Sequence, residues 1–350
     1  MHMADALLSP AVGGVMWATT GVVVASSARR VRDDLDESKI PLMGVAGAFV
    51  FAAQMVNFTI PATGSSGHLG GALMLAVLLG PEAAFLVIAS VLAVQALFFA
   101  DGGLLALGAN IFNLGFFPAF VAYPLIYRRI VGDGPAFDRR RVIVGSLLAA
   151  IVGLQLGALA VVLETTASGI TELPFSTFLW LMQPIHLAVG VVEGLVTAGV
   201  VLFVYRAQPE LLARTAARKP LAGLRLRPVL IGLAVAALVV GGVLSWFAST
   251  HPDGLEWSIA KITGTEERLQ GDSAAHEAAA KIQEKTAVLP GYGLNGVGAA
   301  NGADEGASGG DSGGGTSLSG VAGALIVLAV AGALGFSLRR RSATRAKARA

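Results

Sequence analysis

The sequence predicts an all-α integral membrane protein, and three observations support this fold class. Hydrophobic residues make up 54% of the 350 positions and charged residues 14%, whereas soluble domains have about 45–50% and about 25%. The mean hydropathy is +0.70. The apolar residues cluster in stretches of about 17–25 residues, the length of a membrane-crossing helix. A chain with so few charges cannot form an ordinary hydrated surface, which disfavours a soluble enzyme or a nucleic-acid-binding protein.

Nine apolar stretches are the predicted membrane helices. In chain order they cover residues 11–28, 40–56, 69–80, 85–100, 104–127, 142–164, 176–205, 229–248 and 318–338. The stretch 69–80 is shorter than a full crossing, so we expect a half-length or partly re-entrant helix there. The other eight are expected to cross the bilayer.

The positions of Lys and Arg predict the orientation. If all nine stretches count as crossings, 21 of the 25 Lys and Arg residues fall on one side, and the other four lie in one long loop. Basic residues close to helix ends favour the cytoplasmic side. We therefore expect a multi-pass protein of the plasma (inner) membrane, with its N-terminus outside and its C-terminus in the cytoplasm.

Shifts in composition divide the chain into regions. A basic, proline-containing cytoplasmic linker over 207–228 separates the seven stretches of region 1–206 from the two of region 229–338. The second region includes a long outer loop, 249–317, and a basic cytoplasmic tail follows at 339–350.

The outer loop has two parts. Asp272–Lys285 is expected to be helical, and the Gly/Ala/Asn/Ser-rich tract at about 293–316 is expected to be flexible.

Residues 1–28 have an alternative interpretation as a cleaved signal peptide, with Ser26-Ser27-Ala28 at the cleavage site. However, no Lys or Arg precedes the apolar run and a basic cluster follows it. This is the reverse of the charge order of a signal peptide. We therefore expect these residues to stay in the protein as its first membrane helix.

The residue inventory argues against an enzyme. The chain has no cysteine, which excludes disulfides, thiolate metal sites, iron–sulfur clusters and cysteine nucleophiles. It has no phosphate-binding loop sequence. It also shows no nucleophile–base constellation, so neither a catalytic residue nor a catalytic cofactor is expected.

The first two residues can form a metal chelate. Because His2 is bulky, the initiator Met1 is expected to stay in place. The Met1 α-amine, the His2 backbone nitrogen and the His2 imidazole can then close two fused rings around one ion and leave a fourth planar position open. Four planar nitrogens suit Ni(II), Cu(II) or low-spin Co(II) rather than Zn(II), Mg(II) or Ca(II). The alternative interpretation of His2 is a solvated terminal residue.

His68 is the candidate for the fourth position. It lies in the glycine-rich outer loop Asn57–Gly71, whose glycines allow the backbone to approach another element closely. The predicted topology places His2 and His68 on the same side of the membrane. The alternative interpretation of His68 is a helix-capping or interfacial histidine.

Three segments resemble a known family. The opening Met1-His2-Met3-Ala4-Asp5-Ala6-Leu7-Leu8-Ser9-Pro10, the loop with Asn57-Phe58, Ile60-Pro61 and Ser66-Gly67-His68-Leu69, and the stretch His186–Gly194 are similar to nickel and cobalt uptake proteins of the NikM/CbiM family. These are the substrate-binding components of energy-coupling-factor (ECF) transporters. The resemblance covers about 1–206 and implies a seven-helix bundle.

The second region resembles the partner component of the same transporters. His251-Pro252-Asp253-Gly254-Leu255-Glu256-Trp257 is similar to the P-D-G-L-E-W box of the small N component, which has two membrane helices around an extracytoplasmic loop. The resemblance therefore implies a natural fusion of an M and an N component. Two departures are Met3, where isoleucine is common, and Ala62-Thr63-Gly64-Ser65, where a more glycine-rich run is typical.

The resemblance implies a site and partners. By this resemblance, the metal ligands of the chain are the Met1 amine, the His2 amide and imidazole, and the His68 imidazole. The implied substrate is Ni2+ or Co2+. The implied partners are a transmembrane scaffold (T) component and separate ATPase (A) components, since ATP hydrolysis occurs outside this chain. The N-like region is implied to assist metal loading through its outer loop.

Other functions stay open alongside nickel uptake. One is a cobalt-specific ECF component that serves cobalamin synthesis. A secondary permease is a second alternative, although the His-x4-Asp-His motif of single-chain nickel/cobalt permeases is absent. A membrane-bound metal sensor is a third.

Several polar residues are candidates for a supporting or gating role around the metal. They are Gln54, Asn57, Ser66, His186 and Glu193. His186 and Glu193 lie seven residues apart on one helix face, and ionisable groups inside a membrane are costly and often functional. Their alternative role is a buried structural one. Asp253 and Glu256 are expected to shape a turn, and His276 is expected to be solvated.

Overall fold

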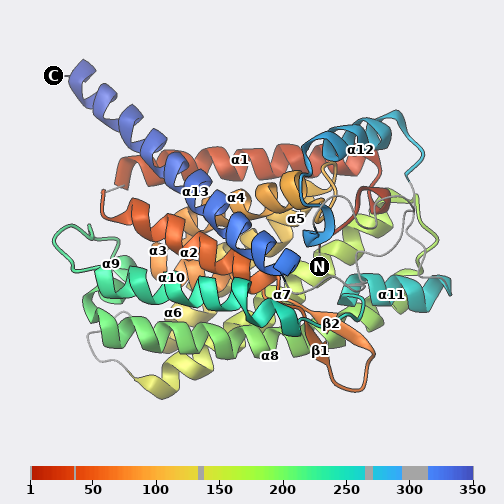
Figure 1. Ribbon diagram of the computed structural model, residues 1–350, viewed down its shortest axis with the longest axis horizontal. Coiled ribbons are helices and arrows are strands. Elements are labelled where there is room, and N and C mark those ends of the chain that lie inside the picture. Colours follow the sequence, from red (N-terminus) through yellow and green to blue (C-terminus); the bar gives the residue numbers. More distant parts are fainter. Residues whose placement is uncertain (1, 35–36, 133–137, 265–270, 294–313, 350) are drawn as a thin grey trace.

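The chain is all-α, as its sequence predicts. The structure, a computed structural model, describes residues 2–34, 37–132, 138–264, 271–293 and 314–349, and these form helices apart from one two-stranded hairpin (Figure 1). In chain order the elements are η1 (Asp5–Leu7), α1 (Pro10–Asp34), α2 (Lys39–Gln54), β1 (Phe58–Ile60), β2 (Ser65–Gly67), α3 (Ala72–Leu79), α4 (Pro81–Phe99), α5 (Leu107–Ile111), η2 (Phe112–Tyr127), α6 (Arg128–Val131), α7 (Arg139–Ser168), α8 (Phe175–Ala207), α9 (Pro209–Ala216), α10 (Arg227–Gly242), η3 (Leu244–Phe247), α11 (Gly254–Thr263), α12 (Ala274–Thr286), η4 (Pro290–Tyr292) and α13 (Gly314–Arg349).

Six helical runs in the described part of the chain are long and apolar enough to cross a membrane. They are α1, α4, the continuous run from α5 to α6, α7, α8 and α13. Two further apolar helices, α2 and α10, have 16 residues each. Each of the nine predicted stretches contains a helix.

The helix α3 is short because glycines bound it at both ends. Gly71 and Gly80 have φ angles of +80° and +84°, which side chains other than glycine rarely adopt. Pro81 then starts α4. All eight residues of α3 are buried, as is typical of a helix that is hydrophobic on every side. A Cβ on Gly71 would lie 2.7 Å from Val50, so this glycine also allows α2 and the start of α3 to touch.

The helices α7 and α8 are held together by polar side chains. Gln155 donates to the Gln183 carbonyl at 3.0 Å, and Gln183 donates to the Gln155 carbonyl at 3.3 Å. Hydrogen bonds between helices help to fix packing where no water is present. This pairing contributes to the position of α8, which carries His186 and Glu193.

The two helices of the second region pack on the first through α2. Both α10 and α13 contact α2, and they contact each other where Gly241 meets Gly320. A Cβ on Gly320 would lie 2.3 Å from the Gly241 carbonyl oxygen. Small residues at such a crossing allow two backbones to approach closely.

The described parts of the segment 249–317 lie towards one end of the bundle. The predicted helix Asp272–Lys285 is present as α12, and the tract at about 293–316 lies largely outside the described residues. The segment 57–71, expected as a loop, contains the antiparallel hairpin β1–β2, with Phe58 opposite Gly67 and Ile60 opposite Ser65. The hairpin, α11 and α12 lie towards one end of the molecule, which we call the hairpin end (Figure 1).

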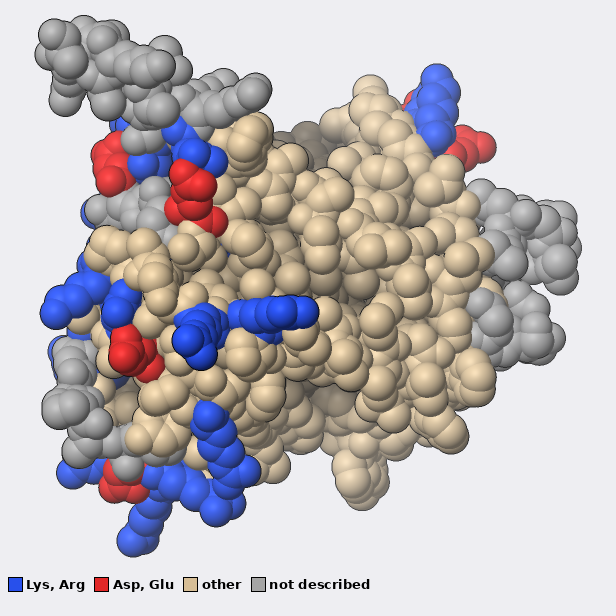
Figure 2. All heavy atoms as spheres, turned by 60° about the vertical axis from the view of Figure 1, so that its left-hand side comes forward, with Lys and Arg blue, Asp and Glu red and all other residues tan. Residues whose placement is uncertain are grey.

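Charged residues gather at the opposite end, which we call the basic end. Figure 2 shows Lys and Arg concentrated on one side of the visible face, beside a broad uncharged surface. There Arg30 and Arg218 both pair with Glu82, at 3.2 and 3.0 Å, and Arg214 pairs with Glu210 at 2.9 Å. The uncharged belt between the two ends is what a bilayer requires of the surface that it covers.

Candidate metal centre

His2 and His68 meet at the hairpin end. Their ring centroids are 4.7 Å apart and their planes are inclined by 31°. The chain around Met3 is anchored beside them, because Asn110 accepts from the Met3 N–H at 2.8 Å and donates to its carbonyl at 3.1 Å. The Gly103 N–H donates to the same carbonyl at 2.9 Å. The N-terminal segment is therefore fixed against the chain around α5. Met1 lies outside the described residues.

The hairpin and α3 position His68. Its Nδ1 lies 3.0 Å from the Leu69 carbonyl, so Nδ1 carries the proton and Nε2 carries the lone pair. Burial of the ring, and the charge of the neighbouring His2, lower the pKa of His68 to about 3. His68 is therefore neutral at physiological pH, which is the form that binds metal ions.

Two buried side chains hold the backbone that follows His68. Gln54 donates to the Gly70 carbonyl at 2.8 Å. The Glu193 carboxylate accepts from the N–H groups of Gly70 and Gly71, at 2.6 and 3.0 Å. These contacts tie α2 and α8 to the His68 loop.

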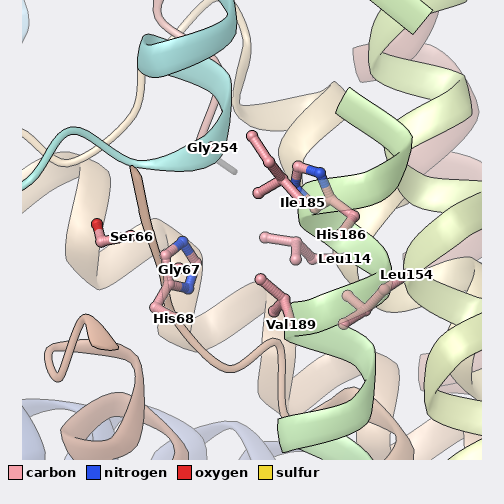
Figure 3. A pocket seen from close by; sticks show the side chains of 9 residues that line it. All are labelled: Ser66, Gly67, His68, Leu114, Leu154, Ile185, His186, Val189 and Gly254. Atoms are coloured by element: carbon pink, nitrogen blue, oxygen red, sulfur yellow. The ribbon is translucent and has the colours of Figure 1, made fainter. Parts of the chain in front are cut away.

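His186 lies on the other side of a small cavity from His68 (Figure 3). The cavity has a volume of about 10 Å³, room for about one water molecule. The Nδ1 of His186 donates to the Met182 carbonyl at 2.8 Å, within its own helix. The hydrogen bonds of His186 and Glu193 thus go to different partners, although both residues face the His68 loop.

Asn57 and Ser66 contact the second region. The Asn57 carbonyl accepts from the Ser249 N–H at 2.8 Å. Ser66 donates through Oγ to the His251 carbonyl and through its N–H to the Pro252 carbonyl, both at 2.8 Å. The two residues therefore join the His68 hairpin to the chain that leads into α11.

Asp253 shapes a turn, as expected, and also faces the site. Its carboxylate caps α11 by accepting from the N–H groups of Leu255 and Glu256, at 2.8 and 2.9 Å, and the Glu256 side chain accepts from the Asp253 N–H at 3.1 Å. Burial raises the pKa of Asp253, but its hydrogen bonds, including that from the Glu256 N–H, contribute to a net lowering. An ionised carboxylate therefore lies beside His68.

Asp101 faces His2, a contact that was not predicted from the sequence. Its Oδ1 lies 2.7 Å from His2 Nδ1, and its Oδ2 accepts from the Tyr292 hydroxyl at 2.5 Å. Burial raises the pKa of Asp101, but its contacts with His2 and Tyr292 outweigh this and lower it. The signal in the sequence was an isolated acidic residue between two apolar stretches, before Gly102-Gly103.

The prediction that His276 is solvated is wrong. Its side chain is 5% exposed, and Nε2 lies 3.0 Å from the carbonyls of both Asp5 and Leu8. The Nδ1 of the same ring lies 2.7 Å from Ser273 Oγ, at the start of α12. The helix α12 packs on η1, and His276 joins the two through these hydrogen bonds.

A family model described as the cobalt uptake substrate-specific transmembrane region, CbiM, matches residues 2–211. The chain belongs to this family. A second model, described as the PDGLE domain, matches residues 227–340. The protein is therefore a CbiM-type region fused to a PDGLE domain, as the resemblance to fused M and N components implied.

Two relatives of this chain are named as fused nickel transport proteins. It is 32% identical over 344 residues to the putative fused nickel transport protein NikMN of Archaeoglobus fulgidus, which covers 98% of this chain and 100% of the relative. It is 36% identical over 276 residues to the fused nickel transport protein NikMN of Rhodobacter capsulatus, with 75% and 77% covered. A crystal structure described as a transition metal transporter matches 62% of this chain and 99% of its own, with a TM-score of 0.53 and 32% identity.

Proposed function

We propose that this CbiM-type protein is the substrate-binding membrane component of an ATP-driven, ECF-type transporter for nickel or cobalt. It captures the ion at the outer face in a planar nitrogen site formed by the Met1 amine, the His2 amide and imidazole, and the His68 imidazole. The observation that carries this proposal is the meeting of the two imidazoles, 4.7 Å apart, at the end of the molecule opposite the basic end.

The chemistry of the donor set supports the proposal. An amide nitrogen and the Nδ1 of the same histidine close one chelate ring, and the amide and the preceding amine close a second. His68 supplies Nε2, because its Nδ1 donates to the Leu69 carbonyl. A backbone carbonyl commonly fixes the tautomer of a ligating histidine in this way. Four planar nitrogens suit Ni(II) and also Cu(II), which raw affinity favours, so the geometry of the site or the supply of metal must select between them.

The surrounding residues have supporting roles in this proposal. Gln54 and Glu193 hold the backbone after His68, and Asn57 and Ser66 connect the hairpin to the PDGLE domain. His186 lines the cavity beside His68 and gates movement of the ion or of the loop. Release of the ion then requires the His68 loop or the N-terminal segment to move.

Separate subunits supply the energy. The sequence has no phosphate-binding loop, so ATP hydrolysis is assigned to A components, coupled through a T scaffold. We place the hairpin end outside and the basic end in the cytoplasm, because Lys and Arg favour the cytoplasmic side. The segment 207–228 is then a cytoplasmic linker between the CbiM-type region and the PDGLE domain.

Metal content tests the site. The purified chain and the variants His2→Ala and His68→Ala are each exposed to equimolar Ni2+, Co2+, Cu2+ and Zn2+ and measured by elemental mass spectrometry. His251→Ala is the matched control, since it removes an exposed histidine of the same end. In the parent and the control we expect about one ion per chain, of a metal that favours planar coordination. We expect almost none in His2→Ala and His68→Ala. Zinc as the main ion, or equal metal in every protein, contradicts the site.

Two further experiments separate the site from the transport role. A chain extended by one residue before Met1, with its N-terminus verified by mass spectrometry, loses the amine from the chelate and should bind weakly. Uptake in cells with and without the ATPase partners tests the coupling. Uptake without them indicates a secondary permease, and tight binding with no uptake in their presence indicates a sensor.

A further inference from the structure

The PDGLE domain reaches the metal centre through a chain of three side chains. Tyr292 donates to Asp101 Oδ2 at 2.5 Å, and Asp101 Oδ1 lies 2.7 Å from His2 Nδ1. The His2 side chain is 7% exposed and that of Asp101 is 24% exposed. The first contact, between His2 and Asp101, lies within the CbiM-type region. The second joins residues 191 positions apart, so it exists only because the PDGLE domain folds back onto that region.

The His2 ring in this structure is in the wrong orientation for the chelate. Chelation with the His2 amide uses Nδ1, which faces Asp101. The other ring nitrogen, Nε2, is buried and has no hydrogen-bond partner among the described residues, although such an atom is normally satisfied. A half-turn of the imidazole about its Cβ–Cγ bond moves Nδ1 away from the carboxylate. The same turn brings Nε2 to the side of the ring that faces Asp101.

We propose that Asp101 is a positioning carboxylate for metal-bound His2, which accepts from His2 Nε2–H once the metal has taken Nδ1, and that Tyr292 of the PDGLE domain holds it in place. This inference rests on the proposed function, in which His2 is a ligand. A ligating histidine commonly donates its second ring N–H to a carboxylate, which fixes the ring and raises its basicity. With the metal on Nδ1 and Asp101 accepting from Nε2–H, both nitrogens of His2 have a partner, whereas the metal-free orientation leaves Nε2 without one among the described residues.

Tyr292 is held firmly enough to orient a carboxylate. Its ring stacks on Phe99, with centroids 4.9 Å apart and planes inclined by 23°, and Ser319 Oγ donates to its carbonyl at 2.8 Å. Its φ of +62° lies in the left-handed region that non-glycine residues seldom adopt. Such a conformation persists where the surrounding contacts over-determine it. The PDGLE domain thus fixes the group that faces His2 without itself supplying a metal ligand.

The test uses the purified full-length chain and Ni2+ as the probe. The variants are Asp101→Asn, which keeps the shape of the side chain and removes its charge, and Tyr292→Phe, which removes one hydroxyl. Tyr127→Phe, a buried tyrosine at the basic end with 6% exposure, is the matched control. The Kd for Ni2+ is measured by competition with a chelator, the d–d absorption band of bound Ni2+ is recorded, and thermal unfolding is measured without metal.

We expect Asp101→Asn to raise the Kd for Ni2+ by about 10–100-fold and to shift the absorption band. Tyr292→Phe should change both in the same direction by a smaller factor, and Tyr127→Phe should change neither. A purely structural role would lower the unfolding temperature and leave the band in place. If Asp101→Asn does not fold, the Kd and the absorption band of Tyr292→Phe test the proposal alone.

Two results would overturn the inference. One is an Asp101→Asn or Tyr292→Phe variant that binds Ni2+ as tightly as the parent with an unchanged band. The other is tighter binding by either variant, which would make Asp101 a competitor for Nδ1. Failure of the proposed function is distinguishable, because the parent chain would then bind Ni2+ no better than His2→Ala.

Discussion

The Glu193 carboxylate, 2% exposed in α8, accepts a hydrogen bond of 2.6 Å from the backbone N–H of Gly70. Its second oxygen accepts from the next N–H at 3.0 Å. An acidic residue inside a membrane helix is costly and is kept where it has a partner. Here the partner is the backbone two residues after His68, so the position of α8 sets the position of the proposed ligand.

Glu193→Gln should weaken both metal binding and stability. A glutamine amide offers one acceptor and one donor, so one of the two buried N–H groups loses its partner and faces another donor. Leaving a buried polar group unsatisfied costs about 1–3 kcal/mol. We expect a lower unfolding temperature together with a higher Kd for Ni2+, measured on the same preparation.

Glu164→Gln is the control for this prediction. Glu164 is a buried carboxylate in the neighbouring helix α7, and it accepts from Asn113 at 2.8 Å, away from the His68 loop. The variant keeps an acceptor for that bond and should leave the Kd unchanged. Equal effects of the two substitutions on metal binding would show that Glu193 acts on general stability alone.

The sequence predicts the helices well because each depends on a local property. An apolar stretch of sufficient length needs no distant partner to be recognised as a membrane helix. Even the short α3 is visible, since Gly71 and Gly80 bound an apolar run. The pairing of His2 with His68 was also predicted, from the chelating chemistry of the first residues and the resemblance to a family.

The sequence could not predict contacts that depend on how the PDGLE domain folds back. The His276 ring lies 268 positions from its partner Leu8, and Tyr292 lies 191 positions from Asp101. No periodicity or local motif contains such information. The hairpin β1–β2 was missed for a related reason: its strands have three residues each, and a glycine-rich segment carries no strand pattern.

Gly67→Ala should displace His68. A Cβ at this position would lie 2.4 Å from Val189 Cγ2 on α8. Because the hairpin is packed against that helix, the new methyl group pushes the strand that leads directly into His68. Overpacking of this kind lowers the free energy of unfolding by about 1–3 kcal/mol. We expect weaker Ni2+ binding, measured by chelator competition, and a lower unfolding temperature.

A second substitution makes this prediction specific. Val189→Ala removes the methyl groups that the new Cβ meets, so the double variant Gly67→Ala/Val189→Ala should recover much of the lost affinity. Gly21→Ala on α1, where a Cβ meets nothing within 4 Å, should be neutral. If the double variant binds no better than Gly67→Ala, the packing of Gly67 on Val189 is not what positions His68.

Gly320→Ala should loosen the packing of α10 against α13 within the PDGLE domain. The added Cβ would lie 2.3 Å from the Gly241 carbonyl oxygen, and a backbone atom cannot move aside as a flexible side chain can. The helices α10 and α13 must therefore separate. We expect a lower unfolding temperature and faster proteolysis of the segment between these helices. Gly332→Ala, in the same helix but with nothing within 4 Å of the new Cβ, should match the parent chain.

His276→Ala should release the N-terminal turn. The His276 Nε2–H donates to the carbonyls of Asp5 and Leu8, both 3.0 Å away, and no alanine atom can replace it. Loss of this buried donor costs about 1–3 kcal/mol. Because η1 begins three residues after His2, greater mobility of η1 also makes His2, the proposed ligand, more mobile. We expect a higher Kd for Ni2+, chiefly through faster dissociation, which stopped-flow chelator capture measures.

His276→Gln tests whether the hydrogen bond itself is responsible. The glutamine amide also places a donor near the two carbonyls, so it should recover part of the affinity that alanine loses. His251→Ala, which removes an exposed histidine from the PDGLE domain, should leave the dissociation rate unchanged. Equal dissociation rates for His276→Ala and the parent would mean that α12 covers η1 without restraining it. Asp101 and the Ser66 contacts would then remain as routes by which the PDGLE domain influences the metal.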